Sequence, residues 1–120
     1  MTYIANPNGN EISCVMFGVD SAILNDNKKL EALLIEAAKK DKFTILGKVS
    51  HCFDPRGFTA MLLLQESHIA IHTYPEYQSL FFYIYSCRGP GDGRKTYEYF
   101  KTALNPKSVH CRENEVIVKK

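Results

Sequence analysis

Apolar residues recur along the chain at two spacings, and each spacing predicts one kind of secondary structure. Residues 28–40 carry apolar side chains at helical intervals with Lys and Glu on the opposite side, which predicts an amphipathic helix packed on a flat surface. The Asn-Asp pair at residues 25–26 precedes it, and either side chain can cap its first turn. A second helix is predicted over residues 92–104, with Asp92 as its cap and an Asn-Pro pair after its last turn.

The other apolar runs have the composition of β-strands. They cover residues 12–17, 43–49, 58–64, 80–87 and 109–118. Turns that contain proline or glycine separate several of them. The order strand, helix, strands, helix, strand predicts an α+β two-layer sandwich, in which an antiparallel sheet carries two helices on one face. The other face of the sheet and the loops are then left for function.

Composition and charge narrow the classes of protein to which the chain can belong. Its 120 residues have the common size of one domain, so we expect a single domain over residues 1–120. Lys and Arg outnumber Asp and Glu by only 15 to 13, an excess too small to indicate a nucleic-acid partner. The longest apolar run is far shorter than a membrane span, and the N-terminus lacks the features of a signal peptide. We therefore expect a cytoplasmic protein without a membrane partner.

The cysteines are irregularly spaced, and no CxxC pair indicates a zinc site or a redox dithiol. They are Cys14, Cys52, Cys87 and Cys111. In a reducing cytoplasm we expect free thiols, and the default for each is a small buried apolar side chain. Cys87 is the exception, because a chemical role is predicted for it from the family resemblance described below.

Residues 62–77, LLLQESHIAIHTYPEY, place a polar cluster between apolar neighbours, which predicts that the cluster is half-buried. If residues 68–72 form a strand, His68 and His72 point to the same face. A zinc site would need more ligands than these two, and the HExxH pattern is absent, so we predict no metal. A serine hydrolase would need a GxSxG elbow, which is also absent. Taken alone, these residues favour hydrogen-bonded histidines beside a surface turn.

The same segment carries a family resemblance. The run ESHIAIHTYPEY at residues 66–77, with HCFDPRGFTAMLLLQ before it and Cys87 after it, resembles the small prokaryotic S-adenosylmethionine decarboxylases. The likeness extends from about residue 24 to residue 107, and the ESHxxxHTxPE core is highly specific. The resemblance implies a pyruvoyl-dependent enzyme of polyamine biosynthesis that makes the aminopropyl donor for spermidine.

The resemblance also implies how the pyruvoyl group arises. Ser67 Oγ would attack the carbonyl of Glu66, and the resulting ester would eliminate and hydrolyse. The chain would divide into residues 1–66 and residues 67–120, with the pyruvoyl group, made from Ser67, at the start of the second piece. His72 would accept a proton in the elimination. Thr59 matches a processing hydroxyl of the family, and we expect it to face Ser67 across a hairpin.

Three further residues match positions that act on the substrate in this family. Cys87 would donate the proton that completes decarboxylation, Phe53 would stack on the adenine, and Glu76 would interact with the substrate. The resemblance implies neither a metal nor pyridoxal phosphate. It also implies a homodimer of cleaved protomers, and we expect the helix-free face or an edge of the sheet to form the contact.

Several positions depart from the family pattern and leave alternatives open. The family's Gly-Arg-His run, the acid four residues before the cysteine, the glycine after it and the tryptophan of HTWPE are replaced here. The residues in their places are Gly9-Asn10-Glu11, Tyr83, Arg88 and Tyr74. One alternative is a relative that decarboxylates ornithine or arginine, whose distal cation Glu11, Asp54 or Glu76 would pair. Another is a non-catalytic homologue that binds and activates a partner. We favour S-adenosylmethionine because Phe53 and Glu76 are both present.

Overall fold

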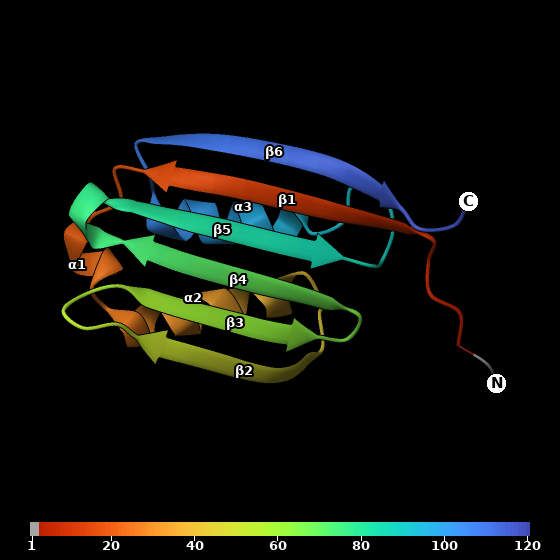
Figure 1. Ribbon diagram of the computed structural model, residues 1–120, viewed down its shortest axis with the longest axis horizontal. Helices are drawn as coiled ribbons and strands as arrows, with labels where there is room; N and C mark the ends of the chain where they lie inside the picture. Colours follow the sequence, from red (N-terminus) through yellow and green to blue (C-terminus); the bar gives the residue numbers. More distant parts are fainter. Residues whose placement is uncertain (1–2) are drawn as a thin grey trace.

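One antiparallel sheet underlies the whole fold, and the two long helices lie behind it in Figure 1. The computed structural model describes residues 3–120. Within that range the sheet has six strands in the order β2-β3-β4-β5-β1-β6. In chain order the strands are β1 (Asn8–Phe17), β2 (Ile45–Cys52), β3 (Phe58–Leu64), β4 (Ser67–Tyr74), β5 (Ser79–Ser86) and β6 (Ser108–Ile117). The helices are α1 (Ser21–Leu24), α2 (Asn27–Lys40), the 3₁₀ turn η1 (Pro75–Tyr77) and α3 (Arg94–Leu104).

The core fills the space between α2, α3 and one face of the sheet. Alternate residues of the central strands point into it because side chains on a strand alternate between faces. The largest fully buried side chains include Ile12, Met16, Leu30, Leu34, Leu62, Ile69, Ile71, Phe82 and Phe100. Burying each contributes roughly 1.5–3 kcal/mol to folding. The predicted α+β sandwich, with both long helices on one face, is confirmed.

The opposite face of the sheet carries no helix and exposes several apolar side chains. Val49, Met61 and Leu63 lie together on β2 and β3, with exposed fractions of 63%, 42% and 58%. The edge strand β6 is exposed along almost its whole length. We call this surface the helix-free face.

Two sequence predictions for the helix caps have different outcomes. The Asp26 carboxylate accepts a hydrogen bond from the Lys29 N–H and caps α2, as expected. The prediction that Asp92 caps α3 is wrong, because Gly93 occupies the cap position with φ +93°. Asp92 is instead bound by Arg88 and Ser86, two partners that the local pattern does not reveal. The short elements α1 and η1 were not predicted.

The expectation that most cysteines are buried is also wrong. Cys14 is buried against the helices, but Cys52 and Cys111 are exposed. Both exposed thiols lie on the outer strands β2 and β6, where the helices do not cover the sheet. Cys87 is half-buried, and all four are free thiols.

Candidate active site

A two-residue turn joins β3 to β4 and contains the peptide bond that the sequence singles out. Leu64 pairs with Ser67, so only Gln65 and Glu66 form the turn. Glu66 has φ +66°, a left-handed conformation that costs a residue with a Cβ roughly 1–2 kcal/mol. The Gln65 N–H donates to the Thr44 carbonyl at 2.9 Å and holds the turn to the preceding loop. The bond between Glu66 and Ser67 therefore directly follows a strained residue.

Ser67 begins β4, and the register of the sheet brings Cys87 beside it. Ser67 pairs with Ser86, the last residue of β5, so the next residue along that chain lies at the serine. The Cys87 N–H donates to Ser67 Oγ at 3.2 Å, although the two residues are 20 positions apart. Ser67 is 5% exposed, whereas the Cys87 side chain is half-buried. The structure thus brings together two of the three predicted catalytic residues.

Thr59 and His72 form a second pair at the other end of the hairpin. They are cross-strand partners, and Thr59 Oγ1 lies 2.9 Å from His72 Nδ1. The expectation that Thr59 faces Ser67 is therefore wrong within one chain. A tight turn at residues 65–66 pairs each residue of β3 with one equally far beyond the turn. Thr59 is far from the turn, and its partner is correspondingly far along β4.

Phe53 and Glu76 lie with this second pair. A hollow of about 310 Å³ is lined by Phe53, Arg56, Gly57, Phe58, Thr59, His72, Thr73, Tyr74 and Glu76. The Phe53 ring is 50% exposed and packs edge-on against His51 at 4.7 Å between ring centroids. The hollow therefore unites an aromatic face, a carboxylate and the Thr59–His72 hydrogen bond.

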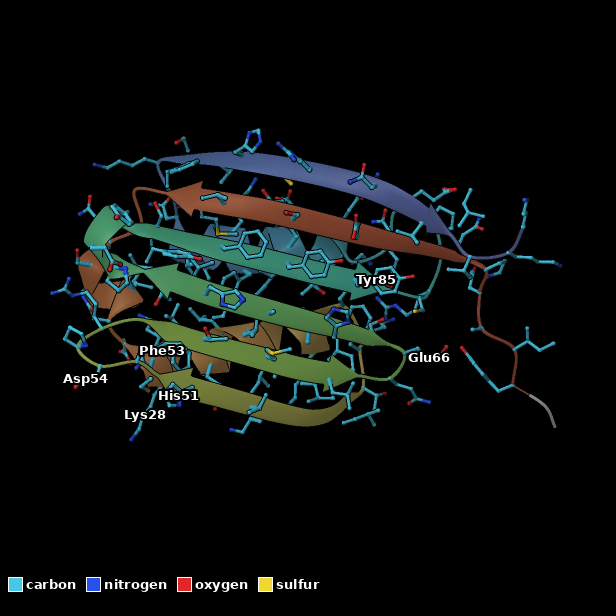
Figure 2. The ribbon with its side chains drawn as sticks, in the orientation of Figure 1. Lys28, His51, Phe53, Asp54, Glu66 and Tyr85 are labelled. Carbon is cyan, nitrogen blue, oxygen red and sulfur yellow. The ribbon has the colours of Figure 1, made fainter. Side chains whose placement is uncertain are left out.

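The two groups of predicted site residues are well separated within one chain. His72 lies five residues beyond Ser67 on β4, which at the usual strand rise is roughly 16 Å. An odd separation also turns the two side chains to opposite faces. Figure 2 shows Phe53 and Glu66, one from each group, at opposite ends of the sheet. One copy of the chain does not bring His72 to Ser67.

A row of aromatic and polar side chains crosses the helix-free face between these groups. His68 lies 5.7 Å and 6.0 Å, between ring centroids, from Tyr83 and Tyr85. The Tyr83 hydroxyl donates to Glu11 Oε2 at 2.6 Å. Burial, followed by that hydrogen bond to a carboxylate, raises the pKa of Tyr83 to about 12. Tyr83 is thus a neutral donor, and Glu11 supplies a carboxylate in the row.

The described part of the chain has neither a cluster of metal ligands nor a helix that could span a membrane. Across residues 3–120, no three His, Cys, Asp or Glu side chains gather as a metal site would require. None of the helices in the same range has the length and apolar character needed to span a membrane.

Comparison with known proteins identifies the family. Residues 10–115 match the family model described as S-adenosylmethionine decarboxylase. The chain belongs to this family. It is 36% identical over 104 residues to the S-adenosylmethionine decarboxylase proenzyme 2 of Bacillus anthracis, covering 87% of this chain and 85% of the relative. It is 33% identical over 107 residues to the S-adenosylmethionine decarboxylase proenzyme of Aquifex aeolicus, covering 89% of this chain and 79% of that relative.

Two solved structures share the fold. The crystal structure of the adenosylmethionine decarboxylase from Aquifex aeolicus superposes with a TM-score of 0.88 at 29% identity, covering 97% of this chain and 96% of that one. A Trypanosoma brucei AdoMetDC monomer superposes with a TM-score of 0.61 at 15% identity, over 85% of this chain and 44% of the larger protein. At that identity the second likeness concerns the fold alone.

Proposed function

We propose that the chain is a pyruvoyl-dependent S-adenosylmethionine decarboxylase that activates itself by cleavage between Glu66 and Ser67. The observation that carries the proposal is the arrangement at the turn, in a chain of this family. A buried serine hydroxyl lies next to Cys87, directly after a residue in a strained backbone conformation. The two bacterial relatives described above are named proenzymes, which agrees with activation by cleavage.

Cleavage would begin with an acyl shift. Ser67 Oγ adds to the carbonyl carbon of Glu66 and loses its proton to a base. The peptide C–N bond then breaks, the nitrogen takes up a proton, and an ester joins the two halves of the chain. Release of the left-handed Glu66 conformation favours this step, because the strain is present only while the turn is intact.

Elimination would then separate the two pieces. A base removes the Cα proton of residue 67, and the Cβ–Oγ bond breaks. Oγ departs as part of the new Glu66 carboxylate and leaves a dehydroalanine. Hydrolysis of that residue releases ammonia and leaves a pyruvoyl group at the start of residues 67–120. His72 is suited to be the base because an imidazole exchanges protons near neutral pH.

The distance between His72 and Ser67 supports a site completed by a second copy of the chain. A twofold dimer formed by the helix-free faces, with the strands running in opposite directions, would lay the His72 end of one sheet over the Ser67 end of the other. Val49, Met61 and Leu63 are exposed apolar side chains that such a contact would cover. Thr59, Phe53 and Glu76 would then lie with His72 over the end of the partner's sheet that carries the Glu66–Ser67 bond.

Decarboxylation would use the same residues after cleavage. A pyruvoyl ketone condenses with a substrate α-amine and accepts the electrons released with carbon dioxide. Cys87 would then donate the proton to the substrate carbon, since its half-buried thiol lies beside residue 67. Phe53 offers a face for the adenine, and Glu76 offers a negative charge for the sulfonium.

Intact mass and substrate turnover test the proposal. Purified wild-type protein should consist of two fragments of residues 1–66 and 67–120, whereas Ser67→Ala should remain one chain. The cleaved protein should release labelled carbon dioxide from S-adenosylmethionine in preference to ornithine or arginine. A wild-type chain that stays intact after long incubation would refute the cleavage. Turnover of ornithine or arginine alone would refute the substrate and leave the cleavage standing.

A further inference from the structure

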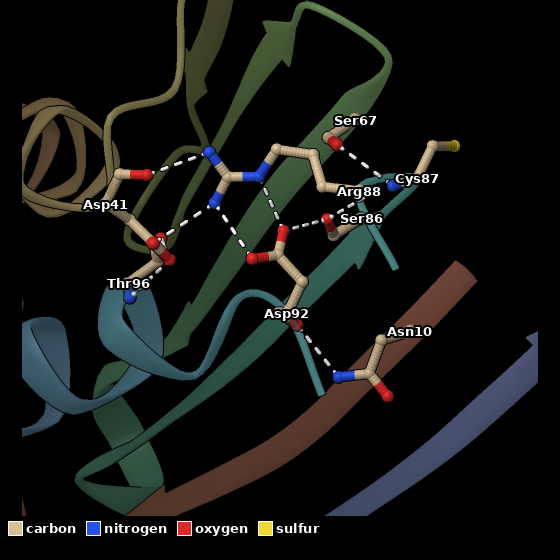
Figure 3. A network of polar contacts seen from close by, with 8 residues as sticks. All are labelled: Asn10, Asp41, Ser67, Ser86, Cys87, Arg88, Asp92 and Thr96. Atoms are coloured by element: carbon tan, nitrogen blue, oxygen red, sulfur yellow. Dashed lines mark hydrogen bonds and ion pairs between the residues drawn. The ribbon is translucent and has the colours of Figure 1, made fainter. Parts of the chain in front are cut away.

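The side chain of Arg88, next to Cys87, is bound by the carboxylates of Asp41 and Asp92 (Figure 3). Its Nε and one terminal nitrogen donate to the two carboxylate oxygens of Asp92, at 2.6 Å and 3.1 Å. The terminal nitrogens also donate to the carbonyl and the carboxylate of Asp41, at 2.8 Å and 3.1 Å. The guanidinium lies 3.5 Å above the centre of the Phe43 ring. These contacts use the planar fork of an arginine, which a lysine does not have.

Both carboxylates that bind Arg88 are themselves fixed. Asp41 is 8% exposed, follows the last turn of α2, and accepts hydrogen bonds from the Thr96 N–H and hydroxyl on α3. Asp92 accepts a hydrogen bond from the Ser86 hydroxyl, and its carbonyl accepts one from Asn10 on β1 at 2.8 Å. Arg88 therefore ties the end of α2, the start of α3 and the sheet to one point.

Arg88 lies directly beside the proposed cleavage site at Ser67. The Cys87 N–H donates to Ser67 Oγ, and the Arg88 N–H donates to Ser86 Oγ, each at 3.2 Å. The loop that follows is rich in glycine, and Gly89, Gly91 and Gly93 all have positive φ. Such a loop has little intrinsic stiffness. The Arg88 side chain is bound to the end of α2, and Arg88 directly follows the residue whose N–H donates to the serine.

We propose that Arg88 is a positioning residue for the elimination step of self-cleavage. This inference rests on the proposed function. During elimination, Oγ leaves as part of the Glu66 carboxylate and gains negative charge. A fixed N–H that already donates to Oγ stabilises this charge without reorganisation, as a preorganised donor does in an oxyanion hole. Arg88 also lines a hollow of about 220 Å³ with Gln65 and Glu66, so the residue lies close to the departing group.

The test follows cleavage over time during cell-free synthesis, by intact mass. Arg88→Met removes the guanidinium and keeps an apolar stem over Phe43. It should slow the appearance of the two fragments by about tenfold, which corresponds to about 1.4 kcal/mol, because the Cys87 N–H is retained but less well positioned. Arg88→Lys keeps the charge without the planar fork, and its rate of cleavage should lie between those of wild type and Arg88→Met. Arg94→Met is the matched control, because Arg94 pairs with Glu113 at 2.8 Å in an exposed ion pair away from Ser67.

Hydroxylamine distinguishes positioning from a loss of stability. It cleaves an ester, so it converts any accumulated ester into a free serine amine and a hydroxamate at Glu66. The unprocessed chains of Arg88→Met should contain much more hydroxylamine-sensitive ester than those of wild type, with His72→Ala as the positive control. A variant that is merely less stable would not favour the ester over the starting amide. Thermal melting of each variant, combined with Ser67→Ala to prevent cleavage, identifies those that fold.

The results separate the two proposals. A wild-type chain that never cleaves would overturn the proposed function itself. Wild-type cleavage rates in folded Arg88→Met and Arg88→Lys would overturn the role of Arg88 alone. Slow cleavage without excess ester in a folded variant would also overturn it. If Arg88→Met does not fold, Arg88→Lys decides by the same two measurements.

Discussion

Cys87 and His72 are the residues at which the two stages of the proposed chemistry separate. Cys87 touches Ser67 through its backbone N–H, whereas its thiol is the group assigned to decarboxylation. His72 has no contact with Ser67 in one chain and is hydrogen-bonded to Thr59. Removing the Cys87 thiol should therefore affect decarboxylation, whereas removing the His72 imidazole should affect cleavage.

Cys87→Ser keeps the backbone N–H and replaces only the proton donor. We expect it to form the two fragments and to lose about a hundredfold or more in decarboxylation, the usual effect of removing a positioned general acid. His72→Ala should stop at the ester. Intact mass and labelled carbon dioxide, measured on the same preparations, distinguish the two outcomes. Near-normal turnover by Cys87→Ser would show that another group donates the proton.

We expect Phe53 to set the preference for an adenine-containing substrate. Stacking a purine on an aromatic side chain contributes on the order of 1–3 kcal/mol. Phe53→Ala should therefore lower kcat/KM for S-adenosylmethionine by about tenfold or more, since 1.4 kcal/mol corresponds to a factor of ten. Phe53→Tyr, which keeps the ring, is the matched control. Loss of activity in Phe53→Tyr as well would mean that the pocket does not tolerate any change there.

At the scale of elements, ion pairs tie the helices to the sheet and make the stability depend on pH. Burial alone would raise the pKa of Asp92, but hydrogen bonds from Arg88 and Ser86 outweigh it and hold that pKa below its usual range. Hydrogen bonds from Lys48 and Arg94 likewise lower the pKa values of Glu31 and Glu113. All three carboxylates are charged at neutral pH. As the pH falls, each one binds its proton at a lower pH in the folded state than in the unfolded state.

A carboxylate whose pKa is lowered by folding contributes fully to the free energy of unfolding above its pKa in the unfolded state, about 3.9 for Asp. This contribution is lost as the pH falls through its pKa in the folded state. We therefore expect the melting temperature of uncleaved Ser67→Ala to fall as pH is lowered from about 5 to about 2. Asp92→Asn in the same background should melt lower at neutral pH and show a smaller fall on acidification. An identical pH dependence in the two proteins would contradict the role assigned to the Asp92 ion pair.

At the scale of the whole molecule, the site residues are distributed over two ends of one sheet. Helices cover only one face of the sheet, so Val49, Met61 and Leu63 on the other face are exposed. Such an apolar patch favours association with another protein surface. A dimer that covers this face would also unite the separated groups. The proposed dimer would account for both the exposed patch and the divided site.

Mixed dimers provide the sharpest measurement of this assembly. Ser67→Ala retains His72, and His72→Ala retains Ser67, so neither should cleave efficiently alone. When they are co-expressed, a mixed dimer has one intact site, and up to about half of the His72→Ala chains should be cleaved if subunits mix at random. Sedimentation should show a dimer. If co-expression cleaves the His72→Ala chains no better than His72→Ala alone, the partner's His72 does not act on Ser67. Either His72 acts within its own chain, or it takes no part in cleavage.

Much of the architecture follows from local patterns. The helical spacing of apolar residues in 28–40 and the alternation in 68–72 depend on neighbours along the chain, so α2, β4 and the shared face of His68 and His72 were predictable. Asp26 was recognisable as a cap for the same reason. Asp92 was assigned wrongly because Arg88, four residues before it, binds its carboxylate, and the helical pattern of residues 92–104 does not reveal this pairing.

The amino-acid sequence by itself determined the family, the α+β sandwich and the residue types available for chemistry, because motifs and periodicity are properties of a short stretch of chain. Only the tertiary structure decided which of those residues meet. Strand register placed Cys87 at Ser67 and Thr59 at His72, and it held His72 roughly 16 Å from Ser67. Register depends on how distant strands pack on a common core. A one-residue shift in pairing would have reversed every side chain on the strand without changing a letter of the sequence.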